Sequence, residues 1–188
     1  EATLPLCEVG SDLAVYFSRT ASSLGLAYAM SGRLTEGVAL LERAAAHARA
    51  IGFAYGHALI VGMLGEARLL AGDVDEAGRR GDEAIALARQ YGQRGYEAWA
   101  LRLQGEIALA LAAPDVADAR FEEAIALAGA RGMRPLLAHC RFGLGNVEAM
   151  RGKPEAARAH VQEALAEYRA MAMPYWLARA EDAWTALA

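Results

Sequence analysis

Cysteine and proline are scarce in this chain of 188 residues, which contains 2 cysteines and 5 prolines. The two cysteines, Cys7 and Cys140, lie far apart and form no Cys-x-x-Cys pair, which excludes a disulfide framework and a cysteine zinc cluster. Proteins with few, widely separated cysteines are typical of a reducing compartment. We therefore expect a cytoplasmic protein.

Long apolar runs and an excess of positive charge are also missing. No apolar run approaches the roughly 20 residues that cross a bilayer, and residues 1–7 lack the basic start and apolar stretch of a secretory signal. The formal net charge of −4 and the pI of about 5.6 provide no basic footprint for a phosphate backbone. We expect neither membrane insertion nor direct nucleic-acid binding. The first residue is not methionine, and the opening segment resembles the end of an earlier element, so we expect further domains upstream.

The signatures of catalytic and metal sites are absent as well. No glycine-rich stretch ends in Gly-Lys-Ser/Thr, and residues 143–148 lack the third glycine and the preceding strand of a dinucleotide site. The four histidines form no His-Glu-x-x-His pattern, and residues 73–76 lack the twelve-residue loop that binds calcium. His139 and Cys140 are adjacent, so on a helix they point about 100° apart and cannot form a nucleophile–base pair. We expect no enzyme, no cofactor and no metal.

A periodic lattice of small residues is the strongest feature that is present. Glycine recurs every forty residues, and an alanine follows nineteen residues after each glycine. The glycines are Gly25, Gly65, Gly105 and Gly145, and the alanines are Ala44, Ala84, Ala124 and Ala164. Such a period indicates one supersecondary unit written four times.

Each unit has the apolar spacing of two helices, separated by a glycine or a polar turn. The abundance of alanine favours closely packed helices over a sheet. We expect helices near residues 12–31, 34–51, 54–71, 74–91, 95–112, 115–131, 135–151, 154–171 and 175–187. The chain then forms a single domain over 1–188, with repeats at 12–52, 53–92, 93–132 and 133–172 and a capping helix at 174–187.

The recurring glycine requires a physical reason, because glycine inside a helix costs about 1 kcal/mol relative to alanine. We expect it to allow the second helix of a unit to lie almost against the first. The alanine nineteen residues later would admit the first helix of the next unit.

The pattern of these units resembles the tetratricopeptide repeat. Leu24-Gly25 with Tyr28, and Ala117 with Phe121 and Ala124, are similar to the residues of that pattern. The resemblance covers almost the whole chain, with units longer than the usual 34 residues and without the proline that normally closes the second helix. It implies an all-α fold, a right-handed α-α superhelix of four helix hairpins plus a C-terminal capping helix.

Three longer stretches carry a narrower resemblance, residues 97–106, 132–140 and 168–177. They are similar to the C-terminal repeat arm of large bacterial signalling proteins that join a class III adenylate or guanylate cyclase-type domain to an AAA-like or STAND-type ATPase. Related arms occur in large ATP-dependent transcriptional activators. The resemblance implies a sensor or assembly arm and contributes no catalytic residue.

In tetratricopeptide superhelices the first helix of each unit lines the concave side, which nominates a stripe of partner-binding residues. Within it, Trp99 and Arg102 are the pair most typical of an interaction hot spot. Alternatively, Trp99 fills space between units and Arg102 pairs with Glu106 on a solvated face. The stripe comprises Arg19, Ser22, Leu26, Leu59, Glu66, Trp99, Arg102, Glu106, His139, Phe142 and Asn146.

The last segment is a second candidate surface. Trp176, Leu177, Ala180 and Trp184 recur at helical spacing, and no second helix follows to cover that face. The segment is either a cap on the preceding helix or an interface that joins two copies of the chain.

Three classes of function follow. The first is a non-catalytic scaffold that binds a protein or peptide, or the upstream domains of the same polypeptide. The second is the small-ligand-sensing arm of a transcriptional or signalling regulator, or a homodimerisation module. The third is an enzyme, which would require a convergent cleft with perturbed titrating groups.

Overall fold

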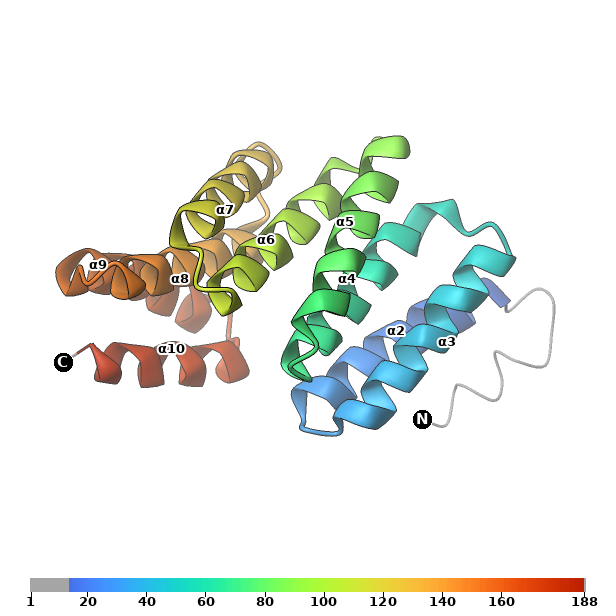
Figure 1. The fold of residues 1–188 in the computed structure, drawn as a ribbon, viewed down its shortest axis with the longest axis horizontal. Helices are drawn as coiled ribbons and strands as arrows, with labels where there is room; N and C mark the ends of the chain where they lie inside the picture. Colours follow the sequence, from blue (N-terminus) through green and yellow to red (C-terminus); the bar gives the residue numbers. More distant parts are fainter. Residues whose placement is uncertain (1–13, 188) are drawn as a thin grey trace. The chain divides into compact units, whose positions relative to one another are not determined.

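The computed structural model describes residues 14–187, and this part of the chain contains nine α-helices and no strand (Figure 1). Cys7 and the expected helix start at residue 12 lie outside the described residues. The helices are α2 (Ala14–Met30), α3 (Leu34–Ala50), α4 (Ala54–Leu70), α5 (Val74–Gln90), α6 (Arg94–Ala110), α7 (Pro114–Gly129), α8 (Arg134–Met150), α9 (Pro154–Ala170) and α10 (Pro174–Ala186). The all-α repeat fold expected from the sequence is confirmed.

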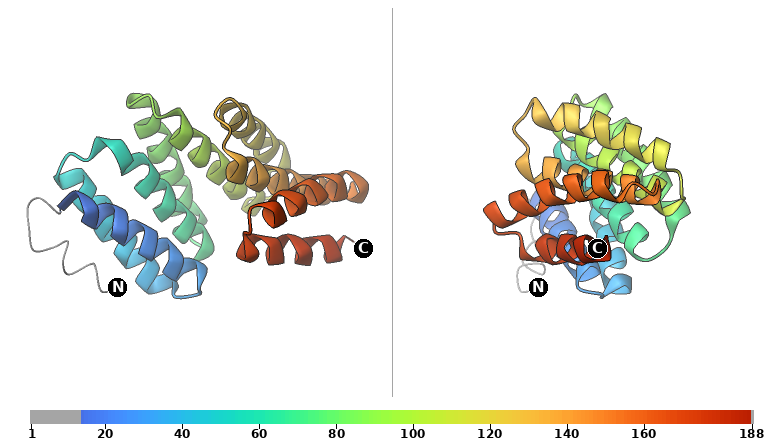
Figure 2. Two further views of the ribbon diagram at one scale, coloured as in Figure 1. Left: turned by 180° about the vertical axis from the view of Figure 1, so that it is seen from behind. Right: turned by 90° about the vertical axis from the view of Figure 1, so that its left-hand side faces the viewer.

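The predicted helix ends agree with the observed ones to within one or two residues, which is the uncertainty of helix assignment itself. Consecutive helices form antiparallel hairpins, as the pairs α2–α3 and α8–α9 show from two sides (Figures 1 and 2). Asp73 is the N-cap of α5, and its carboxylate accepts a hydrogen bond from the Glu76 backbone N–H.

The chain folds into two compact units, and the boundary between them in the sequence lies within α6, between Leu103 and Gln104. The first unit has a core in which Phe17 and Ile60 pack around Ala44. The second unit has a core of α8, α9 and α10 residues, described below. Each unit therefore buries apolar side chains of its own.

The four recurring glycines, Gly25, Gly65, Gly105 and Gly145, are called the marker glycines below, and each lies where two helices come into close contact. A Cβ on Gly25 would lie 2.8 Å from Leu41 Cγ, and one on Gly145 would lie 2.6 Å from Val161 Cγ2. Both distances are too short for a real Cβ, so only glycine admits this approach. The expected reason for the recurring glycine is confirmed at Gly25 and Gly145.

In the second repeat, the marker glycine packs against a different helix. Position 81, which corresponds to Leu41 and Val161, is itself a glycine. A Cβ on Gly65 would instead lie 2.7 Å from Leu103 Cδ2 of α6. The next repeat therefore fills the space that the second helix leaves open.

The alanines nineteen residues after the marker glycines are all fully buried. Ala84 packs against Val61 and Ala100, so α5 contacts α6 of the next repeat through a small side chain. This confirms the expected role of the alanine column as a seam between repeats.

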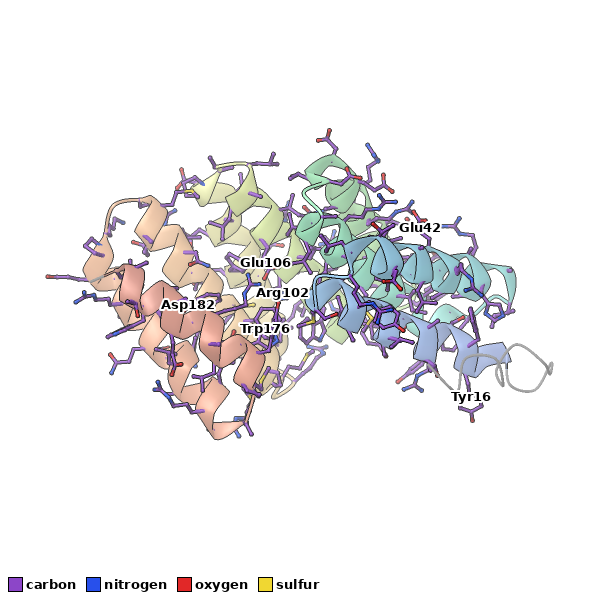
Figure 3. The ribbon with its side chains drawn as sticks, turned by 90° about the horizontal axis from the view of Figure 1, so that it is seen from below. Tyr16, Glu42, Arg102, Glu106, Trp176 and Asp182 are labelled. Atoms are coloured by element: carbon purple, nitrogen blue, oxygen red, sulfur yellow. The ribbon has the colours of Figure 1, made fainter. Side chains whose placement is uncertain are left out.

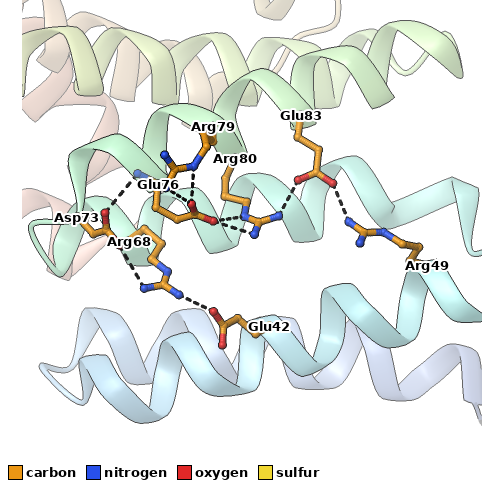
Figure 4. A network of polar contacts seen from close by, with 8 residues as sticks. All are labelled: Glu42, Arg49, Arg68, Asp73, Glu76, Arg79, Arg80 and Glu83. Carbon is orange, nitrogen blue, oxygen red and sulfur yellow. Dashed lines mark hydrogen bonds and ion pairs between the residues drawn. The ribbon is translucent and has the colours of Figure 1, made fainter.

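An ionic network runs along one side of α3, α4 and α5 (Figure 4). Arg68 pairs with Glu42 and Asp73, and Arg80 pairs with Glu76 and Glu83 at 2.7 and 2.8 Å. Hydrogen bonds from Arg79 hold the pKa of Glu76 below its ordinary value, and Arg80 lowers it further. Partly exposed pairs of this kind contribute little individually, and the network orients α5 on its neighbours.

Two alanines occupy a backbone conformation that normally belongs to glycine. Helix ends in this chain carry glycine with positive φ, for example 88° at Gly32 and 63° at Gly132. Ala112 and Ala172 stand in the same columns with φ of 55° and 52°. A Cβ in the left-handed region costs about 1–2 kcal/mol.

Replacing Ala112 with glycine should therefore stabilise the protein. The gain, reduced by the extra freedom of glycine in the unfolded chain, is about 0.5–1 kcal/mol, or about 1–4 °C in thermal midpoint. Ala119→Gly, at an exposed position in the interior of α7, is the matched control and should cost about 1 kcal/mol. Equal shifts of the same sign in differential scanning calorimetry would contradict the strain assignment.

Candidate functional site

A pocket of about 240 Å³ opens in the first unit among the first helices of three repeats, α2, α4 and α6. Its lining is mainly apolar and aromatic. The lining residues are Leu26, Ala58, Leu59, Gly62, Met63, Glu66, Tyr96, Trp99 and Ala100.

Helical periodicity brings these side chains together. Leu59 and Met63 stand four residues apart on α4, and Tyr96 and Trp99 stand three apart on α6, so each pair shares one helix face. Leu26 of α2 closes the pocket from the preceding repeat. The pocket thus needs three consecutive repeats and no loop.

One carboxylate lines this apolar pocket. The side chain of Glu66 is 19% exposed and forms an ion pair with Arg102, which is 1% exposed. Arg102 is labelled in Figure 3. Its guanidinium carbon also lies 5.1 Å from the centroid of the Trp99 ring, within cation–π range. Arg102 therefore balances the charge of Glu66 and supports a wall of the pocket.

A second pocket, of about 100 Å³, lies beside the first and shares Leu59, Met63 and Tyr96 with it. The rings of Tyr55 and Tyr96 meet edge to face there, with centroids 6.3 Å apart. Burial raises the pKa of Tyr96, and the neighbouring Tyr55 raises it further. The Tyr55 side chain is 70% exposed and lies at the rim of this pocket.

The structure brings part of the expected stripe together and places part of it inside the fold. Leu26, Leu59, Glu66 and Trp99 line the larger pocket, and Arg19, Ser22 and Leu59 line the smaller one. Arg19 is exposed, whereas Ser22, Arg102 and His139 are buried. Glu106, Phe142 and Asn146 are half-buried in the second unit. A solvated face around Arg102, the alternative from the sequence, is wrong because this side chain has almost no exposed surface.

Counting outward from the marker glycine missed several pocket residues. Tyr96 stands one turn before Trp99, and Met63 stands one turn after Leu59, so helical spacing could have identified both. Tyr55 lies at the start of α4, where the position of its ring depends on the packing against α6. Gly62 has no side chain and gives no sequence signal of a pocket.

Helix α10 packs on the α8–α9 hairpin of the second unit. The Trp176 ring centroid lies 4.4 Å from that of His139, and His139 Nδ1 lies 2.8 Å from the Tyr168 hydroxyl. Arg158 of α9 donates hydrogen bonds of 3.0 and 2.6 Å to the Leu187 carbonyl, near the Trp184 ring. Trp176, Leu177 and Trp184 all pack against the core of α9, in the position expected of a cap.

In the described part of the chain, the other titratable side chains do not form a metal site. Within residues 14–187, no three histidine, cysteine or acidic side chains lie close enough to hold a metal ion. Burial lowers the pKa of His57, and the charge of Arg49 lowers it further, so both favour the neutral form of this imidazole. Cys140 is buried in α8, as expected for a core residue. None of the described helices combines the length and apolar character needed to cross a bilayer.

No known protein family matches the chain, and no curated protein matches its sequence significantly. Solved structures do match its fold. BtubC (BKLC) from P. vanneervenii superimposes with a TM-score of 0.68 at 20% identity, over 90% of this chain and 70% of that one. Nearly identical TPR-like repeats of a Podosopora anserina protein described as a kinesin light chain match with a TM-score of 0.62 at 18% identity, over 88% of this chain and 85% of theirs.

A third structure combines a similar repeat region with an ATPase. It is a Signal Transduction ATPase with Numerous Domains (STAND) protein with a tetratricopeptide repeat sensor, from Pyrococcus horikoshii. The TM-score is 0.67 at 16% identity, over 93% of this chain and 27% of that protein. The fold is a tetratricopeptide-like helical repeat. The structural similarity establishes the fold. At sequence identities of 16–20% it does not establish the activity, which has to be argued from the site.

Proposed function

We propose that this chain is a non-catalytic interaction scaffold that binds a protein or peptide on the first-helix surface of its first unit. The observation that carries the proposal is the apolar pocket shared by α2, α4 and α6. Large aromatic side chains in pockets dominate the binding energy of interfaces, and Tyr96 and Trp99 remain half-buried at this one.

We further propose that the scaffold is the regulatory or sensor arm of a larger bacterial signalling ATPase or cyclase in the cytoplasm. The likeness to the repeat sensor of a STAND protein supports this proposal, and the chain covers 27% of that protein's length. Upstream domains of the same polypeptide then become candidate partners beside a separate protein or peptide. The half-buried pocket would couple partner binding to the packing of three repeats.

Site-specific photo-crosslinking tests the scaffold proposal. A benzophenone amino acid at Tyr55, on the rim of the smaller pocket, should crosslink a protein partner in cells that make the full-length protein. The matched control is the same replacement at Leu111, which is also exposed, follows the C-terminal end of α6 and lines neither pocket. Mass spectrometry identifies the adduct. Equal adduct yields at both positions, or none at Tyr55, would refute the assignment of the surface.

A further inference from the structure

One wall of the larger pocket is a glycine that the fold itself does not require. Gly62 lies in the interior of α4, where a Cβ would meet only Ala84 Cβ at 3.9 Å, an ordinary contact. Three residues later, a Cβ on Gly65 would lie 2.7 Å from Leu103. Glycine at position 62 therefore costs about 1 kcal/mol of helix stability relative to alanine without serving a close helix contact.

The other repeats carry a side chain in this column. Positions 22, 102 and 142, each forty residues from the next equivalent position, hold serine, arginine and phenylalanine. The second repeat alone leaves the column empty, and it is the repeat whose first helix forms the middle wall of the pocket. The missing side chain at Gly62 is thus what keeps the pocket open.

The volume of the pocket selects the size of the occupant. A cavity of about 150 Å³ holds benzene, and pockets for whole drug-sized ligands span about 300–1,000 Å³. The pocket of about 240 Å³ lies between these limits and fits one large side chain. If a peptide carries this side chain, its neighbouring residues can also contact the adjoining smaller pocket, which shares Leu59, Met63 and Tyr96 with the larger pocket.

The lining selects the chemistry of the occupant. Tyr96 and Trp99 offer ring faces and edges, and the Met63 thioether favours contact with aromatic rings. The Glu66 carboxylate can accept a hydrogen bond from an N–H or O–H group, while its charge is already balanced by Arg102. The site therefore suits an uncharged aromatic ring with one hydrogen-bond donor and disfavours a carboxylate.

We propose that this pocket receives an aromatic anchor side chain of the bound peptide, tryptophan or tyrosine, whose donor group points to Glu66. The inference rests on the proposed scaffold function and adds the identity of the anchor. It assigns to Gly62 the role of leaving space for the anchor ring.

Indole, the side-chain ring of tryptophan, is the direct probe. We expect saturable shifts of the Met63 methyl resonance in an NMR titration of the wild-type protein, with a Kd near about 1 mM for so small a ligand. 1-Methylindole, which lacks the N–H donor, should bind at least about threefold more weakly, and benzoate should not bind. Absence of saturable indole binding, or benzoate binding equal to that of indole, would overturn the proposal.

Gly62→Met fills the pocket from within and should weaken indole binding at least about tenfold. Gly62→Ala is a milder variant that should weaken binding less while raising the thermal midpoint, since alanine is the better helix former. Indole affinity unchanged in Gly62→Met, with the fold intact by circular dichroism, would overturn the role of Gly62.

The crosslinking experiment separates this inference from the scaffold function. If the benzophenone at Tyr55 captures the partner in the wild-type background and loses it with Gly62→Met, the anchor assignment is supported. If capture survives Gly62→Met, the scaffold proposal stands and the aromatic anchor is refuted. If the wild-type protein captures no partner at Tyr55, the scaffold proposal fails, and the anchor assignment that rests on it fails as well.

Discussion

Gly105→Leu should lower the thermal midpoint of the protein by about 6–12 °C, which corresponds to a loss of about 3 kcal/mol. A Cβ on Gly105 would lie 2.7 Å from Phe121 Cε1, and the nearby ring atoms are equally close. Phe121 has little room to retreat, because it also contacts Gly143 of α8, where an added Cβ would lie 2.3 Å from Cζ. The ring is fully buried between two glycines, so extra volume must displace a helix.

Gly129→Leu is the matched control for this prediction. Gly129 is exposed at the end of α7, no atom lies within 4 Å of its added Cβ, and its φ is not positive. We expect its midpoint to stay within about 2 °C of the wild type. The double variant Gly105→Leu with Phe121→Ala should lose less than the sum of its parts, because the leucine occupies the vacated space. Additive losses in calorimetry would show that the close contact with Phe121 is not the cause.

Tyr168→Ala should destabilise the second unit by about 3–5 kcal/mol. The Tyr168 side chain is fully buried, packs with Val161 and Leu165, and its ring lies 5.5 Å from His139 and 6.5 Å from Trp176. Truncation leaves a cavity beneath α10 and removes the hydroxyl that bonds His139 Nδ1 at 2.8 Å. Loss of near-ultraviolet circular dichroism from the tryptophans should accompany the lower midpoint.

Tyr168→Phe isolates the hydrogen bond and should cost about 1 kcal/mol. Tyr175→Ala removes a neighbouring tyrosine that is 38% exposed and should cost less than about 1 kcal/mol. If Tyr168→Ala were no more damaging than Tyr175→Ala, α10 would not be held as a cap by this cluster. An oligomer that dissociates when the chain ends at Ala172, seen by sedimentation, would favour the alternative role of α10 as an interface.

The repeat lattice predicted most of the fold because it records local requirements. Glycine at the close approach of two helices, glycine at the helix ends and alanine at the seams each act between neighbouring residues or neighbouring helices, so their period appears directly in the sequence. Leu26, Leu59, Glu66 and Trp99 were predicted as surface residues from this register, and they meet at one pocket. Whether that pocket binds a partner stays a prediction.

Residues at equivalent positions of different repeats have different surroundings in the structure. Arg102 and Gly62 occupy one repeat column, yet the first is a buried partner of Glu66 and the second is an open pocket wall. Position 81 is a glycine, and Leu103 of the next repeat packs in the space beside Gly65. Periodicity cannot distinguish such cases, because the identity of the residue that packs opposite depends on a different repeat.

The sequence by itself determined the helical class, the forty-residue period, the helix ends and the glycine contacts of the first, third and fourth repeats, since each follows from backbone sterics and hydrophobic spacing within one hairpin. Only the tertiary structure decided which side chains the repeats share: the burial of Arg102, the pocket beside Gly62 and the packing of Trp176 on His139. Those outcomes depend on volumes and charges contributed by several helices at once, and no single stretch of the chain contains them.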